Sequence, residues 1–248
     1  MKLRLILFDL WGTLIQMDCP EEGRVRDELR QRMVSDALAE QGLSYEARHM
    51  ARAFACAGTE LSGVHESGRD LTAEGRTVLY MRHLDPELGD RLDGGAWDRL
   101  HKAILTPDLS TRPAIIPGAA ETLRDVKDLG LSVGLISNAG VTPGFVLREI
   151  LAGHMLLDHF DDTIFSDEAE MSKPTTAIFE LALDAFGVAA EDAVFVGDQP
   201  LLDVLGPQSA GIRAIQLGDL SADGITPDAR IASLGDLLPA LRSLGMAE

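Results

Sequence analysis

Residues 3–15 read LRLILFDLWGTLI, and an aspartate stands at the end of their apolar run. The pattern predicts a buried strand over residues 3–8 that leads directly into Asp9. Burying an ionised carboxylate is costly unless it is paired, bound to a metal or used in chemistry. Gly12 and Thr13 then turn the chain away, as loops do at the carboxyl ends of parallel strands, where such sheets bind ligands. Asp9 is therefore a candidate functional residue.

From Pro113 onward, short apolar runs alternate with helical patterns of ten to fifteen residues. This alternation predicts right-handed βαβ units and an α/β fold with a parallel sheet. Residues 3–8 are expected to join that sheet, because continuous apolar runs suit strands covered on both faces. The expected strands are 3–8, 131–136, 163–166, 192–197 and 212–217, and the expected helices are 117–130, 143–152, 173–187, 200–211 and 234–244.

The stretch between residues 16 and 112 contains helical patterns and lacks clear strands. It reads as an insertion after the first strand, placed to cover the carboxyl ends of the strands, and most of its apolar residues are expected to pack in a core of their own. The helical patterns are residues 21–42, 45–61, 72–84 and 94–105.

Charge narrows the classes of partner. The chain has 248 residues and a net charge of −18, which argues against nucleic acid and anionic membranes. Residues 16–112 contain 18 acidic and 13 basic residues, whereas the rest of the chain contains 22 acidic and 9 basic residues and so carries most of the negative charge. The remainder also carries the motif-like carboxylates, so a site there that handles an anionic substrate needs a metal cation.

Three features bear on location. Asp9 interrupts the first apolar run and no small-residue cleavage site follows, so we expect no signal peptide. No stretch approaches the ~18 apolar residues that a membrane span requires. Cys19 and Cys56 are too few for a disulfide framework or a zinc site and are expected to be free thiols. We therefore expect a cytoplasmic protein with no membrane partner.

Reactive or polar residues stand at the ends of the expected inner strands and at the start of one helix. In a parallel sheet these strand ends gather at one edge. Taken singly, each residue has a plainer explanation, such as a helix cap, a turn or a surface position. Together they combine a nucleophile, hydroxyl and amide donors, a cation and carboxylates of the kind that bind Mg²⁺. The residues are Asp9, Thr13, Ser137, Asn138, Lys173, Asp198 and Asp203.

Four segments resemble the haloacid dehalogenase (HAD) superfamily of hydrolases, and the resemblance extends over essentially the whole chain. It implies a Rossmann-like, doubly wound parallel sheet with an all-helical cap domain inserted after the first strand. The catalytic core would comprise residues 1–15 and 113–248, and the cap residues 16–112. The segments are LILFDLWGTL, IIPGAAETLRDVKDLGLSVGLISNA, IFSDEAEMSKPTTAIFELAL and AVFVGDQPLLDVLGPQSAGI.

The same resemblance implies roles for the residues of the strand ends. Asp9 would be the nucleophile that forms an aspartyl-phosphate intermediate. Ser137 would hydrogen-bond the transferring phosphoryl group, and Lys173 would neutralise it and steady Asp9. Thr13 and Asn138 would contact the substrate.

The resemblance also implies a magnesium site and hence a Mg²⁺-dependent phosphohydrolase. Its ligands would be the carboxylates of Asp9 and Asp198 and the main-chain carbonyl of Trp11, with Asp203 supporting the loop.

Trp11 departs from the pattern, because most phosphatases of the family carry a second aspartate at this position as general acid and base. Such catalysis is worth typically ~10²–10⁴-fold in rate. The missing acid could come from the substrate or from the cap, or the leaving group could need little protonation. The cap histidines are candidates that the sequence cannot separate: His49, His65, His83 and His101.

Two other interpretations remain open. Metal-independent dehalogenases of the family have an aromatic residue at the position of Trp11, but they lack the Gly-Asp that this chain keeps at 197–198. A non-catalytic binding protein could retain the fold and the metal site. Phosphonate hydrolases also lack the second aspartate but use a cap lysine; the insertion has only Lys102, late in its sequence, which argues against that chemistry. We rank the phosphohydrolase first, acting on a small phosphorylated metabolite, because a cap excludes water and large substrates. The sequence leaves the oligomeric state open.

Overall fold

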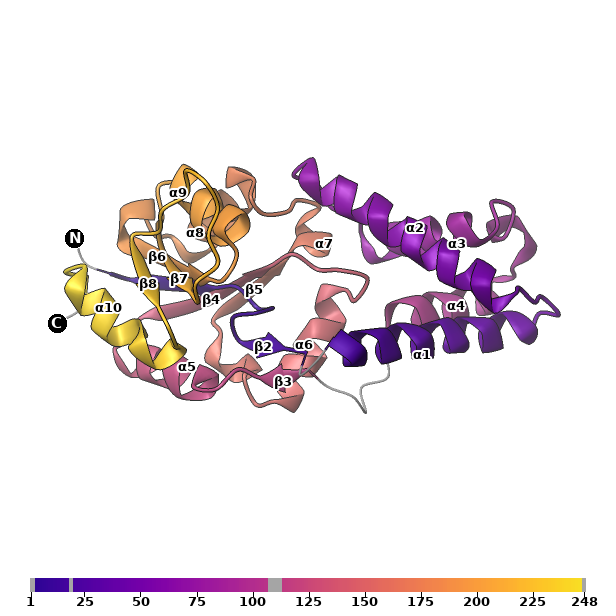
Figure 1. Ribbon diagram of the computed structural model, residues 1–248, viewed down its shortest axis with the longest axis horizontal. Helices are drawn as coiled ribbons and strands as arrows, with labels where there is room; N and C mark the ends of the chain where they lie inside the picture. The colour runs from indigo at the N-terminus through magenta and orange to yellow at the C-terminus, as the bar shows by residue number, and fades with distance from the viewer. Residues whose placement is uncertain (1–2, 18–19, 107–112, 247–248) are drawn as a thin grey trace.

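The computed structural model describes residues 3–17, 20–106 and 113–246. Within these ranges, six parallel strands form the main sheet in the order β5-β4-β1-β6-β7-β8, which places the first strand near the centre (Figure 1). The predicted Rossmann-like α/β fold is confirmed. The strands are β1 (Leu5–Phe8), β4 (Ser132–Ser137), β5 (Asp162–Phe165), β6 (Ala193–Gly197), β7 (Arg213–Leu217) and β8 (Ala229–Ile231).

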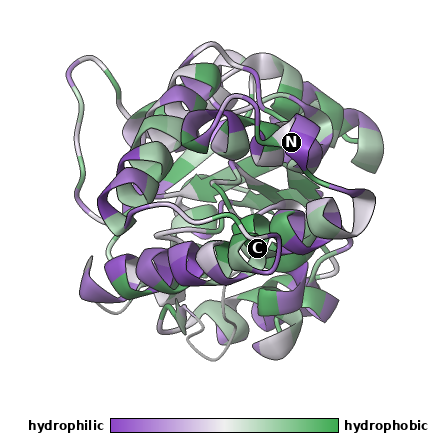
Figure 2. Ribbon diagram, turned by 90° about the vertical axis from the view of Figure 1, so that its right-hand side faces the viewer, coloured by the Kyte–Doolittle hydropathy of each residue, from purple (hydrophilic) through white to green (hydrophobic). Residues whose placement is uncertain are grey.

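Helices cover both faces of this sheet. They are α5 (Ala119–Asp128), α6 (Gly144–Gly153), α8 (Thr176–Phe186), α9 (Gly206–Ser209) and α10 (Leu237–Ser243). Alternate residues of β1 enter two separate apolar clusters. Ile6 and Phe8 belong to the cluster of α5, α6 and α10, whereas Leu5 and Leu7 belong to the cluster of α8. Because side chains alternate along a strand, an unbroken apolar run supplies both cores. Figure 2 shows the hydrophobic strands enclosed by helices with hydrophilic outer faces.

Pairing of β1 with both neighbours brings the polar strand ends together. Phe8 is in register with Leu135 on β4 and with Val196 on β6. The next residue, Asp9, donates its N–H to the carbonyl of Val196 at 2.9 Å. The residues that follow the inner strands therefore meet at one edge of the sheet.

Between β1 and β4 the chain forms a group of helices with its own apolar cluster, which includes Leu38, Leu61, Leu79 and Leu100. These helices extend away from the sheet, beyond the edge where the carboxyl ends of the inner strands lie (Figure 1). Cys56 is a free, exposed thiol, and Cys19 lies outside the described residues. The helices are α1 (Pro20–Ala39), α2 (Ala47–Glu66), α3 (Ala73–Leu84) and α4 (Gly94–Leu105).

Some elements differ from the sequence-based prediction. Residues 15–16 and 114–115, on either side of the helical group, form an antiparallel ribbon, β2 (Ile15–Gln16) with β3 (Ala114–Ile115). The predicted helix start at Lys173 is wrong: α8 begins at Thr176, because a residue before proline disfavours helical backbone and Pro174 follows Lys173.

The predicted helix at 200–211 is divided into a π-helical stretch (Pro200–Leu205) and α9. Short helical turns complete the described chain: α7 (Ser166–Ala169) and the 3₁₀ turns Gly89–Arg91, Leu157–His159, Ala190–Asp192 and Leu234–Asp236.

Candidate active site

A buried lysine joins two buried aspartates at the carboxyl edge of the sheet. Lys173 Nζ lies 2.6 Å from Asp9 Oδ1 and 2.7 Å from Asp203 Oδ1. The three residues are 1%, 6% and 1% exposed, in that order. Charge-assisted hydrogen bonds of this length hold both partners in place. The structure thus brings together residues that are up to 194 positions apart in the sequence.

Burial sets the protonation behaviour of this group. Desolvation raises the pKa of Asp9 to about 7, against the opposing effect of Lys173 and with help from Asp203 and Asp198. Burial alone would lower the pKa of Lys173, but the carboxylates of Asp203 and Asp9 outweigh it and raise that pKa. Lys173 is therefore a permanent cation beside Asp9.

Asp198 completes a cluster of carboxylates with Asp9 and Asp203, in which one oxygen from each residue lies within 4.8 Å of the other two. Its Oδ1 atom is buried and has no hydrogen-bond partner among the described residues. Burial and the nearby Asp203 raise the pKa of Asp198. A hard divalent cation would satisfy a buried, unpartnered oxygen in a cluster of carboxylates such as this one.

The donors fit Mg²⁺ through two of the three carboxylates. Both oxygens of Asp203 already accept hydrogen bonds, Oδ1 from Lys173 and Oδ2 from the N–H of Gln199 at 2.9 Å, so this residue serves to hold Lys173 and the loop. Asp9 and Asp198 each keep an oxygen that could bind the metal ion. The carbonyl of Trp11 accepts no hydrogen bond from a described backbone N–H, so it is available to the ion as well.

Gly12 is required beside this cluster, since a Cβ there would lie 2.6 Å from Asp198 Oδ2, and its φ is +79°.

Asn138 positions the lysine. Its Oδ1 accepts from the N–H of Lys173 at 2.8 Å, and its Nδ2 donates to the carbonyl of the same residue at 3.0 Å. Two polar groups near the cluster are less engaged. Ser137 Oγ contacts only the carbonyl of Asn138, at 3.5 Å, and Thr13 Oγ1 is buried without a partner among the described residues. Both hydroxyls remain available as donors.

The sequence profile described as haloacid dehalogenase-like hydrolase matches residues 3–211 of the chain. The chain belongs to this family. HAD-like hydrolases with phosphatase names are among its relatives. The phosphoserine phosphatase of Thermus thermophilus is 36% identical over 137 residues, which cover 55% of this chain and 52% of that protein.

A second relative matches nearly end to end. The phosphoglycolate phosphatase of Rhodospirillum rubrum is 27% identical over 252 residues, covering 95% of this chain and 90% of that protein. The first curated relatives are matched over only about half of their own length. A crystal structure of 2-haloacid dehalogenase from Pseudomonas syringae pv. tomato superposes over 98% of this chain and 99% of its own, with a TM-score of 0.71 and 24% identity. At that identity the likeness shows the fold.

Trp11 of this HAD-like hydrolase is half-buried and packs against the apolar cluster of β1 and α5. None of the four histidines of the helical group forms a hydrogen bond or ion pair with Asp9 among the described residues. Each of them contacts another group instead. His49 contacts the carbonyl of Leu84 and His65 the carboxylate of Asp70. His83 contacts Glu60, and His101 contacts the hydroxyl of Thr77.

Sequence reasoning missed two glutamines that support the site. The N–H of Gln199 holds Asp203, and its side chain donates to Asp198 at 2.7 Å. Gln216 is buried near the end of β7 and donates to the carbonyl of Asp198 at 3.0 Å. Gln216 stands between Ile215 and Leu217 in the expected strand IRAIQL, and a polar side chain at such a position was its signal.

A buried ionic network that the sequence did not indicate links the helical group to the loop after β4. Arg76 on α3 is fully buried and donates to the carbonyl of Gly140 and to Asp70. Asp70 also accepts from Ser166, at the start of α7, whose hydroxyl in turn accepts from the N–H of Ala139 at 2.8 Å. The network holds Ala139 and Gly140, which directly follow Ser137 and Asn138. No helix in the described ranges is long and apolar enough to cross a bilayer.

Proposed function

We propose that this chain is a Mg²⁺-dependent phosphohydrolase that acts on a small phosphorylated metabolite. The observation that carries the proposal is the contact of Lys173 with Asp9 beside the orphaned oxygen of Asp198. A buried nucleophile, a fixed cation and free carboxylate oxygens are the parts that phosphoryl transfer requires. The names of the two phosphatase relatives, both of small phosphorylated acids, support this substrate class.

Asp9 attacks phosphorus in this proposal. A bond forms between its carboxylate oxygen and phosphorus while the bond to the leaving oxygen breaks; water then attacks phosphorus and frees phosphate and Asp9. Lys173 neutralises the phosphoryl oxygens and orients Asp9, and Ser137 and Thr13 donate hydrogen bonds. Asn138 acts through the backbone of Lys173 and is a positioning residue.

Asp9, Asp198 and the Trp11 carbonyl would hold Mg²⁺. When bound, the ion neutralises charge on the phosphoryl group. Asp203 keeps Lys173 in place, and Asp198 is oriented by Gln199 and Gln216.

In this account residues 1–15 and 113–248 act as the catalytic core and residues 16–112 as a cap that excludes water and large substrates. We place the enzyme in the cytoplasm, without nucleic-acid or membrane partners.

Dehalogenation is the second candidate, because Trp11 is aromatic and a 2-haloacid dehalogenase shares the fold. The retained Asp198 and Asp203 favour phosphoryl chemistry, since a metal-free displacement of halide has no need of a carboxylate cluster.

Purified protein should release phosphate from p-nitrophenyl phosphate and acetyl phosphate only with Mg²⁺, and Asp9→Asn should abolish the release. Both substrates have good leaving groups, so the missing acid matters least there. Halide release from 2-chloropropionate without metal, together with no phosphate release, would reject the phosphatase in favour of the dehalogenase.

A further inference from the structure

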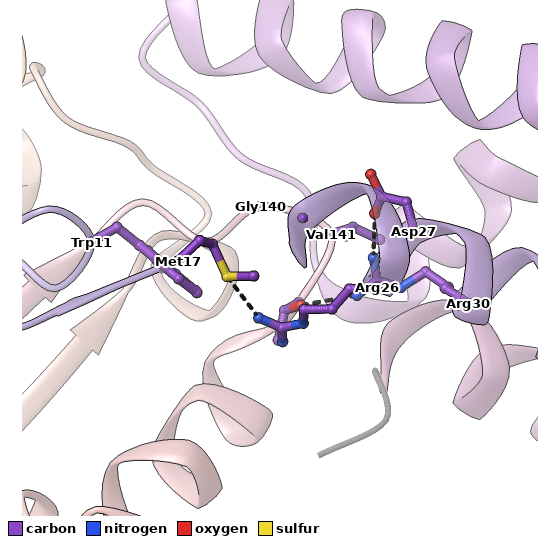
Figure 3. A pocket seen from close by; sticks show the side chains of 9 residues that line it. Trp11, Met17, Arg26, Asp27, Arg30, Gly140 and Val141 are labelled. Atoms are coloured by element: carbon purple, nitrogen blue, oxygen red, sulfur yellow. Dashed lines mark hydrogen bonds and ion pairs between the residues drawn. The ribbon is translucent and has the colours of Figure 1, made fainter. Parts of the chain in front are cut away.

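The loop that follows β4 is held by two buried arginines of the helical group. Arg76 on α3 donates to the carbonyl of Gly140, and Arg30 on α1 donates to Thr142 Oγ1 at 3.1 Å. Figure 3 shows Gly140 beside the first turns of α1, from which Arg30 extends. Two helices outside the sheet therefore hold the chain directly after Asn138.

Asp70, in the turn between α2 and α3, joins one of these arginines to the core. Its side chain is fully buried, and its Oδ2 lies 2.5 Å from Arg76 Nη2 and accepts a hydrogen bond from Ser166 on α7. The same hydroxyl of Ser166 accepts from the N–H of Ala139 at 2.8 Å. His65 Nε2 lies 3.0 Å from the carboxylate as well. One carboxylate thus connects α2, α3 and α7 with the loop after β4.

The turn between α2 and α3 also pairs with the segment that leads into Lys173. The N–H of Asp70 donates to the carbonyl of Glu170 at 3.2 Å, and the N–H of Ser172 donates to the carbonyl of Gly68 at 3.1 Å. An antiparallel bridge lies between these two bonds. The turn is therefore bonded to the chain before Lys173 as well as to the loop after β4.

Stability alone does not account for a buried ion pair at this place. Taking a carboxylate and a guanidinium out of water is costly, and apolar side chains of similar volume often stabilise a fold as well or better. Burial acts to raise the pKa of Asp70, but contacts with His65, Arg76 and Ser166 outweigh it and lower that pKa. What such a pair adds to apolar packing is direction, because its hydrogen bonds fix where each partner lies.

We propose that Asp70 and Arg76 are positioning residues of the reaction, which align from the helical group the two loops that carry Asn138 and Lys173. The inference rests on the proposed function. Both side chains are fully buried, so they act through other residues. A misplacement of about 1 Å at a reacting centre can cost ~10²-fold in rate. Loss of these contacts should therefore slow the chemical step more than it weakens substrate binding.

Ser166→Ala tests the inference, because it removes the link between Asp70 and Ala139 and keeps both charges of the ion pair. With p-nitrophenyl phosphate and Mg²⁺, kcat should fall about tenfold or more and KM should change by less than about twofold, the pattern of an interaction made mainly in the transition state. Asp70→Asn should cause a similar loss. The double variant should lose little more than either single variant, since both changes break the same link.

Thr77→Val is the matched control. Thr77 follows Arg76 on α3 and is equally buried, but its hydroxyl contacts Ala73 and His101 of the helical group. Its kcat should stay at the native value, although a buried hydroxyl is lost. A native kcat in both Ser166→Ala and Asp70→Asn, or an equal fall in Thr77→Val, would overturn the inference and leave the proposed function standing. If the native protein released no phosphate, both proposals would fail.

Discussion

At the scale of single residues, the carboxylate of Asp9 is less stable in the fold than in water, although Lys173 lies 2.6 Å away. Desolvation and two neighbouring aspartates outweigh the lysine, and the pKa of Asp9 rises to about 7. A carboxyl whose pKa is raised in the folded state stabilises that state below its ordinary pKa. The contribution is lost as the pH rises through the folded value.

Asp9→Asn should therefore stabilise the metal-free protein at pH 8, by on the order of 1 kcal/mol or more. The difference from the native chain should shrink as the pH falls from about 7 to about 4, the window between the raised and the ordinary pKa. Thermal unfolding in a chelator across this range measures it, with Asp223→Asn on an exposed loop as the control. Identical pH profiles for the native chain and Asp9→Asn would contradict this account of Asp9.

In the proposed reaction, the indole of Trp11 cannot donate a proton to the leaving group. Trp11→Asp should restore a general acid and raise the rate for phenyl phosphate relative to p-nitrophenyl phosphate by about tenfold or more, within the ~10²–10⁴-fold that such catalysis contributes. Trp11→Phe, which keeps an aromatic ring, should leave that ratio unchanged. A ratio that stayed constant in Trp11→Asp would show that the native substrate obtains its proton elsewhere.

At the scale of elements, α3 is tied to the loop after β4 by the buried Arg76. Removing Arg76 from its buried ion pair would leave the carboxylate of Asp70 with only His65 and the hydroxyl of Ser166 as side-chain partners among the described residues. Arg76→Met should lower the free energy of unfolding by about 3–5 kcal/mol, measured by urea denaturation. The exposed pair of Arg82 with Glu60 on the neighbouring helices provides the control, since Arg82→Met should cost about 1 kcal/mol or less. Similar losses in the two variants would argue against a structural role for the network.

The helices and strands of the core could be predicted because each leaves a periodic pattern, as in the unbroken apolar run of β1. The site could be predicted because parallel strands bring Asp9, Ser137 and Asp198 to one edge. The ribbon of β2 and β3 could not, since two-residue strands leave no period. Contacts such as Arg76 with Gly140 could not either, because their partners lie 64 residues apart on different elements.

At the scale of the whole molecule, most of the surplus negative charge belongs to residues 1–15 and 113–248, the part that holds the carboxylate cluster. A cation that binds only the folded state stabilises it by mass action, about 2.7 kcal/mol at a hundred times its Kd. Mg²⁺ should therefore raise the unfolding temperature of the native protein, and Asp198→Asn should remove most of that shift.

Asp219→Asn is the matched control, because Asp219 is exposed just after β7 at the same edge of the sheet. If Asp198→Asn kept the whole magnesium effect, the proposed metal site would be wrong.

The central claim is that Asp9 accepts a phosphoryl group. The most direct measurement is to mix the protein with acetyl phosphate and Mg²⁺, quench in acid within one turnover and analyse the peptides by mass spectrometry. The account predicts a phosphoryl group on Asp9, absent from Asp9→Asn. Turnover without an adduct, or an adduct on another residue, would contradict it.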